Sequence, residues 1–248
     1  MPLLGLHMTV ARELVAELHS PAIDTERGAY YLGATTPDIR ALIRCDRART
    51  HFFQLDEFGE QSGVHGLFEQ EPGLRDASAL DPATVAFLAG YISHLVMDET
   101  YITQIYRPFF GAGSTRSDDL MANVMDRLLL YHLDKQHRED LPALDEIRSA
   151  LTETSAEYAI DFLSRSDLRQ RRDVQIEIAS RPPSFAKMLT RHLATVGIEG
   201  EDAVSHFMEQ NAEVLLHDTI AHIGEERIRE YLFDSKERAR RAMKEYLS

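Results

Sequence analysis

A histidine and an aspartate, His94 and Asp98, stand one helical turn apart in an apolar stretch, FLAGYISHLVMDETYITQIYRP. At this spacing two side chains point from the same face of a helix. The apolar neighbours indicate a buried helix, in which an unpaired carboxylate is strongly destabilising. A divalent cation would compensate that charge, because neutral imidazole and carboxylate oxygen are ordinary zinc ligands. The alternative interpretation is a buried His–Asp hydrogen bond that ties two helices together.

Three more potential ligands precede this pair in the sequence. They are His7 in PLLGLH, Asp38 in GAYYLGATTPDI and His51 in ARTHFF. Each motif is weakly specific alone. Their order carries more information: a histidine close to the N-terminus, an aspartate in a loop, a histidine at a helix start, and then the HxxxD pair.

In this order the motifs resemble the zinc-dependent phospholipase C and single-strand nuclease superfamily, which are all-α enzymes with a trinuclear metal cluster. The resemblance covers about the first half of the chain. It implies that removal of Met1 frees the amine of Pro2 as a ligand. It also implies that four side chains surround one metal, those of Asp38, His51, His94 and Asp98.

The resemblance further implies that Asp98 bridges to a second metal, which His7 and the Pro2 backbone complete. Two metals roughly 3.5–4 Å apart activate water and clamp a phosphoryl oxygen. By the same resemblance, Asp38 has the catalytic role of orienting or deprotonating the metal-bound water. The cofactor expected is Zn²⁺, as one or two ions.

The ligands of the family's third metal are largely missing from this chain. Gln104 and Ala122 stand where the family has histidines, and Asp126 alone matches the acidic ligand. The N-terminal residue, Pro2, also replaces the usual tryptophan. We therefore expect the third site to be lost, which leaves open a two-metal phosphoesterase or a binding protein without activity.

The second half of the chain offers further candidate ligands in LLHDTIAHIGEER. His217 and His222 are about 140° apart around a helix and do not share a face, whereas Asp218 and His222 do. They are either additional metal ligands or a polar helix edge. His217–Asp218 is also the dipeptide that a histidine–aspartate phosphohydrolase needs, an alternative that would leave the N-terminal motifs unexplained.

Composition limits the class of protein. The 248 residues carry a formal net charge of −14, which disfavours general binding to nucleic acids. No apolar run approaches the roughly 20 residues of a membrane-spanning helix. A basic n-region and a cleavage site are missing from the N-terminus, and Cys45 is the only cysteine. The expected location is the cytoplasm, without a transmembrane segment.

Apolar residues recur with a helical period along most of the chain, whereas alternating strand patterns are hard to find. Helices are predicted at residues 8–19, 81–106, 117–137, 143–164, 184–196, 201–222 and 225–246. Loops are predicted at residues 33–40, 59–82, 108–117 and 165–183. The fold class predicted is all-α, a multi-helix bundle with long loops that is phospholipase C/nuclease-like. Residues 1–248 form one domain in this interpretation, with the metal site in residues 1–137 and a helical half in residues 138–248.

Three functions remain open at this point. The first is a zinc-dependent hydrolase of phosphate esters, acting on a small phosphoester or a phospholipid headgroup. The second is a helical protein with a structural metal and no turnover, and the third is a helical interaction module without metal. A homodimer is a further expectation, since helical proteins of this size often pair.

Overall fold

The computed structural model describes residues 3–54, 61–181 and 185–248, and within these ranges the chain is helical, with no strand. The all-α prediction is therefore confirmed. The first part contains α1 (Leu4–Leu18), α2 (Pro21–Thr25), α3 (Arg27–Gly33), η1 (Thr36–Ile39), α4 (Arg40–Ile43), α5 (Ala48–His51), α6 (Gly63–Gln70), η2 (Pro72–Leu74), η3 (Ala77–Ala79) and α7 (Pro82–Tyr101). The rest contains η4 (Ile102–Tyr106), α8 (Arg107–Phe109), α9 (Ala122–His137), α10 (Leu141–Glu153), α11 (Arg165–Ala179), α12 (Phe185–Ala194), α13 (Glu201–Gln210), α14 (Ala212–Ile223) and α15 (Glu225–Leu247).

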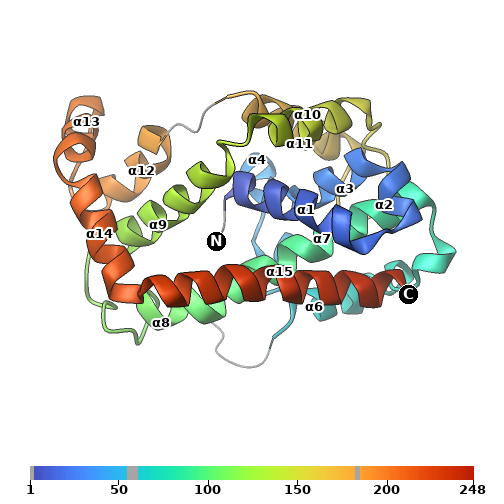
Figure 1. The fold of residues 1–248 in the computed structure, drawn as a ribbon, viewed down its shortest axis with the longest axis horizontal. Coiled ribbons are helices and arrows are strands. Elements are labelled where there is room, and N and C mark those ends of the chain that lie inside the picture. The colour runs from blue at the N-terminus through green and yellow to red at the C-terminus, as the bar shows by residue number, and fades with distance from the viewer. Residues whose placement is uncertain (1–2, 55–60, 182–184) are drawn as a thin grey trace.

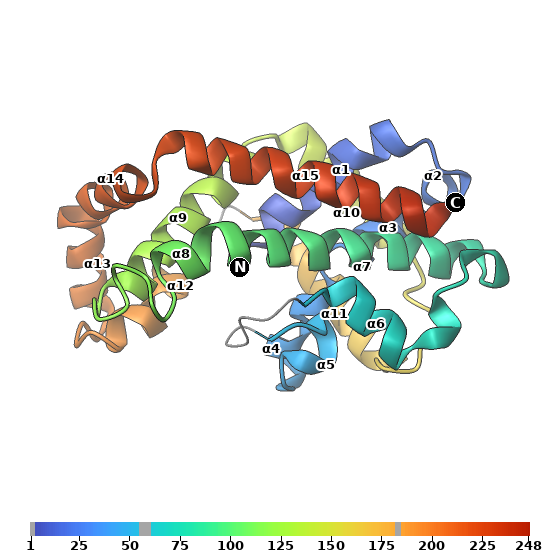
Figure 2. The ribbon, with the colours of Figure 1, turned by 90° about the horizontal axis from the view of Figure 1, so that it is seen from below.

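Helix α7 is the central element of the molecule, and its most extensive contacts are with α3 and α15. Figures 1 and 2 show α15 running along α7, and in Figure 2 α4 and α5 lie on the other side of α7. Helices α12, α13 and α14 gather at one end, beyond α9. The larger apolar core draws on the whole length of the chain, from Leu6 to Tyr246, while a smaller core joins α9 to α12 and α13.

The start of α7 follows directly from its sequence. The Asp81 side chain accepts a hydrogen bond from the amide of Thr84 at 3.0 Å, and Pro82 occupies the first turn, where no amide donor is needed. The helix is buried on almost every side, and it continues through the π-helical η4 into α8. A buried helix of this length gives the side chains of His94 and Asp98 a rigid support.

Close approach of α3 to α7 depends on two glycines. A Cβ atom on Gly33 would lie 1.9 Å from the carbonyl oxygen of Phe87, and one on Gly90 would lie 2.0 Å from that of Tyr30. The backbones of the two helices therefore touch at these positions. The contact brings the carbonyl of Ala34, just after α3, onto the ring of His94.

The predicted loop at 165–183 is wrong, because most of it forms α11. Ser164 caps this helix by accepting a hydrogen bond from the amide of Asp167. Its buried face consists of Leu168, Arg171, Gln175 and Ala179. Two of these four residues are polar, so the helix has little apolar period and escapes a search for one.

Other elements also differ from the prediction, and the helix predicted at 117–137 begins only at Ala122. Part of the predicted loop at 59–82 is α6, which Ser62 caps at the amide of His65. The helix predicted at 143–164 ends at Glu153, and Ala156 beyond it has a left-handed backbone, with φ +56°. The helix predicted at 201–222 is two helices, α13 and α14, which Asn211 separates.

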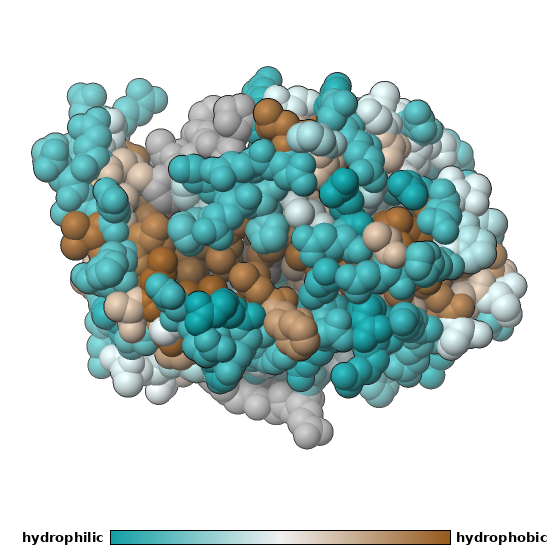
Figure 3. Space-filling model, in the orientation of Figure 1, coloured by the Kyte–Doolittle hydropathy of each residue, from teal (hydrophilic) through white to brown (hydrophobic). Residues whose placement is uncertain are grey.

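The surface combines a charged exterior with a few apolar areas. Figure 3 shows apolar surface in a hollow where α9, α14 and α15 meet. The large apolar side chains that are most exposed are those of Leu120, Leu141, Val214 and Phe233. In the described part of the chain, no helix combines the length and apolar character that crossing a membrane requires. The single domain and the homodimer remain predictions.

Candidate metal centre

Five of the predicted ligands converge on one place. We call His7 (α1), Asp38 (η1), His51 (α5), His94 and Asp98 (both α7) the His/Asp cluster. One ligand atom from each of His7, His94 and Asp98 lies within 4.8 Å of the other two, and the same holds for Asp38, His51 and His94. Pro2, the sixth predicted ligand, lies outside the described residues.

Asp98 directs its two carboxylate oxygens at different histidines. Oδ1 lies 3.5 Å from Nε2 of His7, while Oδ2 lies 3.2 Å from Nε2 of His51 and 3.7 Å from Nε2 of His94. Two ligands about 2 Å from a tetrahedral zinc ion are themselves about 3.3 Å apart. The observed separations therefore match those of neighbouring ligands, and the carboxylate faces two groups of imidazoles at once.

Hydrogen bonds on the far side of two rings set which nitrogen faces Asp98. Nδ1 of His94 lies 2.9 Å from the carbonyl oxygen of Ala34, which only accepts, so Nδ1 carries the proton and Nε2 is left with a lone pair. Nδ1 of His51 similarly contacts the hydroxyl of Thr50 at 3.1 Å. Such outer contacts orient histidine ligands in metal sites.

Several buried atoms of the cluster have no hydrogen-bond partner within the described part of the chain. They are Nδ1 and Nε2 of His7, Nε2 of His51, Nε2 of His94 and Oδ1 of Asp98. Unsatisfied buried polar atoms are rare and point to an ion or water. The side chains of His7, His51, His94 and Asp98 are at most 2% exposed. The residues present therefore fit a bound divalent cation, with imidazole and carboxylate as donors.

The electrostatics of the cluster favour a neutral His94 ring beside ionised carboxylates. Burial, followed by repulsion from His7, lowers the pKa of His94 to about 3, and the two rings stack with centroids 3.8 Å apart. Burial alone would raise the pKa of Asp98, but the facing imidazoles and Arg47 outweigh it and hold this pKa well below its usual range. Both charge states are those that a metal requires.

Asp38 differs from the other members because it reaches the surface. Its side chain is 24% exposed, and Oδ1 lies 3.5 Å from Nε2 of His51. Burial tends to raise the pKa of Asp38, but the nearby imidazoles of His51 and His94 outweigh it and hold this pKa below its usual range. Pro37 opens the 3-10 turn η1 that carries this carboxylate to the edge of the cluster.

Two arginines belong to the site and were missed by the sequence analysis. Nη2 of Arg47 lies 3.0 Å from Oδ2 of Asp98, and Arg171 donates to the carbonyl of Thr35 from the inner face of α11. Arg47 precedes His51 by four residues, the same spacing that singled out His94 and Asp98. That spacing could have identified Arg47 from the sequence. No comparable pattern marks Arg171, because α11 itself was not predicted as a helix.

The N-terminal turn of α1, which carries His7, is capped from a distant helix. Leu3, at the N-cap position, offers no side-chain acceptor. Instead Oδ1 of Asp134, on α9, accepts from the amide of Leu6 at 3.1 Å. This is the bond that an N-cap side chain would make. Asp134 also lies 3.7 Å from Nη1 of Arg138.

We expect Asp134→Ala to lower the free energy of unfolding by about 1–2 kcal/mol, the range for loss of an N-cap. The same change loosens the turn that places His7, so metal affinity also decreases. Chemical denaturation and metal titration measure the two effects. Glu139→Gln is the control, because it also removes one negative charge but at an exposed residue. Equal losses of stability and metal affinity in the two variants would contradict the capping role of Asp134.

The candidates for a third metal lie apart from the His/Asp cluster. Gln104 donates from Nε2 to Asp234 on α15 at 2.8 Å. Asp126 accepts a hydrogen bond from the hydroxyl of Tyr101 at 2.6 Å and is buried. Ala122 is the first residue of α9. Among the described residues, none of these belongs to a group whose ligand atoms meet as those of the cluster do.

The candidates on α14 also lie outside the cluster. His217 and Asp218 are exposed, and His222 is half-buried with its ring edge-on to Phe109, 5.6 Å between centroids. The described residues bring no other potential ligand to them in a metal-binding group. This arrangement matches the polar helix edge, and the residues described around the His217–Asp218 pair do not supply the further ligands that a histidine–aspartate phosphohydrolase needs.

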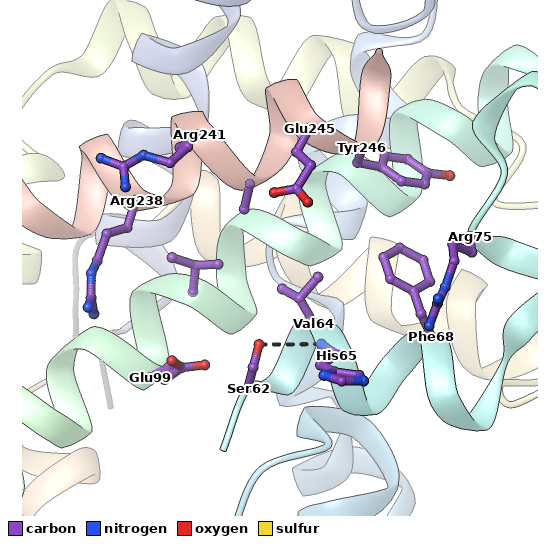
Figure 4. Close-up of a pocket in the computed structure, with 12 residues that line it drawn as sticks. Ser62, Val64, His65, Phe68, Arg75, Glu99, Arg238, Arg241, Glu245 and Tyr246 are labelled. Carbon is purple, nitrogen blue, oxygen red and sulfur yellow. Dashed lines mark hydrogen bonds between the residues drawn. The ribbon is translucent and has the colours of Figure 1, made fainter. Parts of the chain in front are cut away.

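A cavity of about 590 Å³ follows another face of α7, between α6 and α15. Figure 4 shows Glu99, His65 and Glu245 around it, with Arg238 and Arg241 on α15. Glu99 adjoins Asp98 in sequence but turns toward this cavity, where it accepts from the amide of Gly63. The members of the His/Asp cluster are not among its lining residues.

Comparison with known proteins found no family model, no curated protein and no solved structure that matches this chain.

Proposed function

We propose that the chain is a metal-dependent hydrolase of phosphate esters, with a phospholipase C-like two-zinc site that the residues of the His/Asp cluster would hold. The observation that carries the proposal is that the two oxygens of Asp98 have different partners, Oδ1 facing Nε2 of His7 and Oδ2 facing Nε2 of His51 and His94. A carboxylate bridge between two imidazole groups is suited to a two-metal site.

Bound divalent ions would supply Lewis acidity and lower the pKa of water. The residues of the chain contribute the remainder. His7, His51, His94 and Asp98 hold the cations in a buried site, and the outer hydrogen bonds of His51 and His94 keep Nε2 aimed inward. Asp38, the partly exposed carboxylate, would orient a water molecule and accept its proton, and its 24% exposure supports this role.

A second candidate is a metal that only stabilises the fold. It is favoured by the deep burial of four of the five cluster residues and by the position of the large cavity along another face of α7. In this case the metal adds its binding free energy to folding, and no substrate reaches it.

The first experiment is metal analysis of the untagged chain after removal of Met1. We expect about two zinc or similar ions per chain. Metal at 1,000 times its dissociation constant adds about 4 kcal/mol to the free energy of unfolding, so a chelator should lower the melting temperature by several degrees.

Hydrolysis of chromogenic phosphate monoesters and diesters then separates the two candidates. Metal-dependent turnover that Asp38→Asn abolishes, with the metal retained, supports the hydrolase. Bound metal without turnover on either substrate supports the structural role. Protein that binds no metal, and whose melting is unaffected by a chelator, excludes both and leaves a buried His–Asp contact.

A further inference from the structure

Arg47 is a buried cation with unused hydrogen-bond donors. The residue is 7% exposed. Nη2 contacts Asp98, but Nε and Nη1 are buried and make no hydrogen bond within the described residues. A guanidinium is always charged and carries its donors in a planar fork that matches the oxygens of a carboxylate or a phosphate. One edge of that fork is therefore without a partner among the residues that the structure describes.

Metal binding at Asp98 would change the charge balance around Arg47. In the ligand-free cluster, the carboxylates of Asp38 and Asp98 balance the guanidinium groups of Arg47 and Arg171. A single divalent cation would neutralise both carboxylates by itself. The positive charges of Arg47 and Arg171 would then lack a counter-charge inside a buried site, which is costly unless an anion enters.

The other arginines near the cluster also favour the binding of an anion. Arg171 is 3% exposed, and its pKa is lowered to about 10 because burial outweighs the attraction of Asp38, so it stays charged at neutral pH. Burial, against the attraction of Asp98 and Asp38, also lowers the pKa of Arg47, and the charge of Arg40 adds to this effect. The charges of three arginines thus act on the region of the His/Asp cluster, in a chain whose net charge is −14.

We propose that Arg47 exchanges partners, pairing with Asp98 in the metal-free chain and binding the terminal phosphate of a phosphate monoester when metal is bound. This inference rests on the proposed function and specifies its substrate class. A monoester phosphate carries close to two negative charges at neutral pH, since its second pKa is about 6. A monoester phosphate therefore compensates more of the positive charge that metal binding leaves than a diester or a carboxylate, each of which supplies one negative charge.

The test is calorimetric titration of inorganic phosphate and of dimethyl phosphate into metal-loaded protein at pH 7.5, with excess metal removed. We expect phosphate to bind at least 10-fold more tightly than dimethyl phosphate, and only when metal is present. Arg47→Gln should weaken phosphate binding roughly 10- to 100-fold, the range for a charged hydrogen bond. Its metal affinity should be equal or higher, since Asp98 is released from its ion pair.

Arg49→Gln is the matched control, because Arg49 is an exposed residue two positions after Arg47, and its side chain donates to the carbonyl of Phe162. It should bind phosphate and metal as the parent chain does. Arg47→Lys keeps the charge but loses the fork, and it should give an intermediate phosphate affinity. If Arg47→Gln fails to fold, the phosphate affinity of Arg47→Lys tests the same prediction.

Distinct outcomes overturn the inference and the proposed function. A parent chain without metal overturns both, before any phosphate is added. A metal-loaded parent chain that prefers dimethyl phosphate, or an Arg47→Gln variant that binds phosphate as well as Arg49→Gln does, overturns the inference alone. Loss of metal from Arg47→Gln also overturns it, since Arg47 would then hold Asp98 in place for the metal.

Discussion

Asp98→Asn should bind metal more than about 100-fold more weakly than the parent chain. Residues that merely support metal ligands contribute 10- to 100-fold to affinity, and Asp98 is in direct contact with three imidazoles. The metal-free variant should also unfold more easily, by about 3–5 kcal/mol, because Arg47 is left as an unpaired buried charge. Elemental analysis and chemical denaturation in the presence of a chelator measure the two effects separately.

Glu99→Gln is the control for this substitution. It removes the same charge from the next residue of α7, but Glu99 faces the cavity between α6 and α15 rather than the His/Asp cluster. Metal content should remain that of the parent chain. If both variants lose metal equally, the effect belongs to the net charge of the helix and not to the Asp98 carboxylate.

Gly90→Ala should destabilise the fold and weaken metal binding together. A Cβ at this position would lie 2.0 Å from the carbonyl oxygen of Tyr30 and 2.7 Å from the amide nitrogen of Ala34. Both are backbone atoms, so α3 must move away from α7. Overpacking of this kind costs about 1–3 kcal/mol or more. The displacement separates Ala34 from His94, which removes the hydrogen bond that orients the ring.

The direction of the expected change in stability distinguishes this steric effect from an effect of helix propensity. Alanine is favoured over glycine in a helix by roughly 1 kcal/mol, so Gly90→Ala without steric conflict would be stabilising. Gly73→Ala is the control, because a Cβ there meets nothing within 4 Å. Thermal melting and metal titration should show losses for Gly90→Ala and little change for Gly73→Ala. A more stable Gly90→Ala protein would mean that α3 and α7 are not in contact here.

The sequence by itself determined the helical class and the members of the His/Asp cluster. A helix that buries one face carries apolar residues at a helical period within its own sequence. For this reason the bounds of α1, α7, α9 and α15 were predicted to within a few residues. His94 and Asp98 were found because a polar pair on an apolar helix needs a compensating partner. His7, Asp38 and His51 were found through the order of motifs, and the structure places all five together.

Only the tertiary structure decided which residues surround the cluster. Arg47 neutralises Asp98, Asp134 caps α1 from α9, and Arg171 approaches from α11, and these contacts join segments that are 51 to 136 residues apart. Partners at such separations leave no periodic trace in the sequence. Polar residues on the inner face of α11 even removed its apolar period, and the partner of Arg171 on that face, the carbonyl of Thr35, is distant in the sequence.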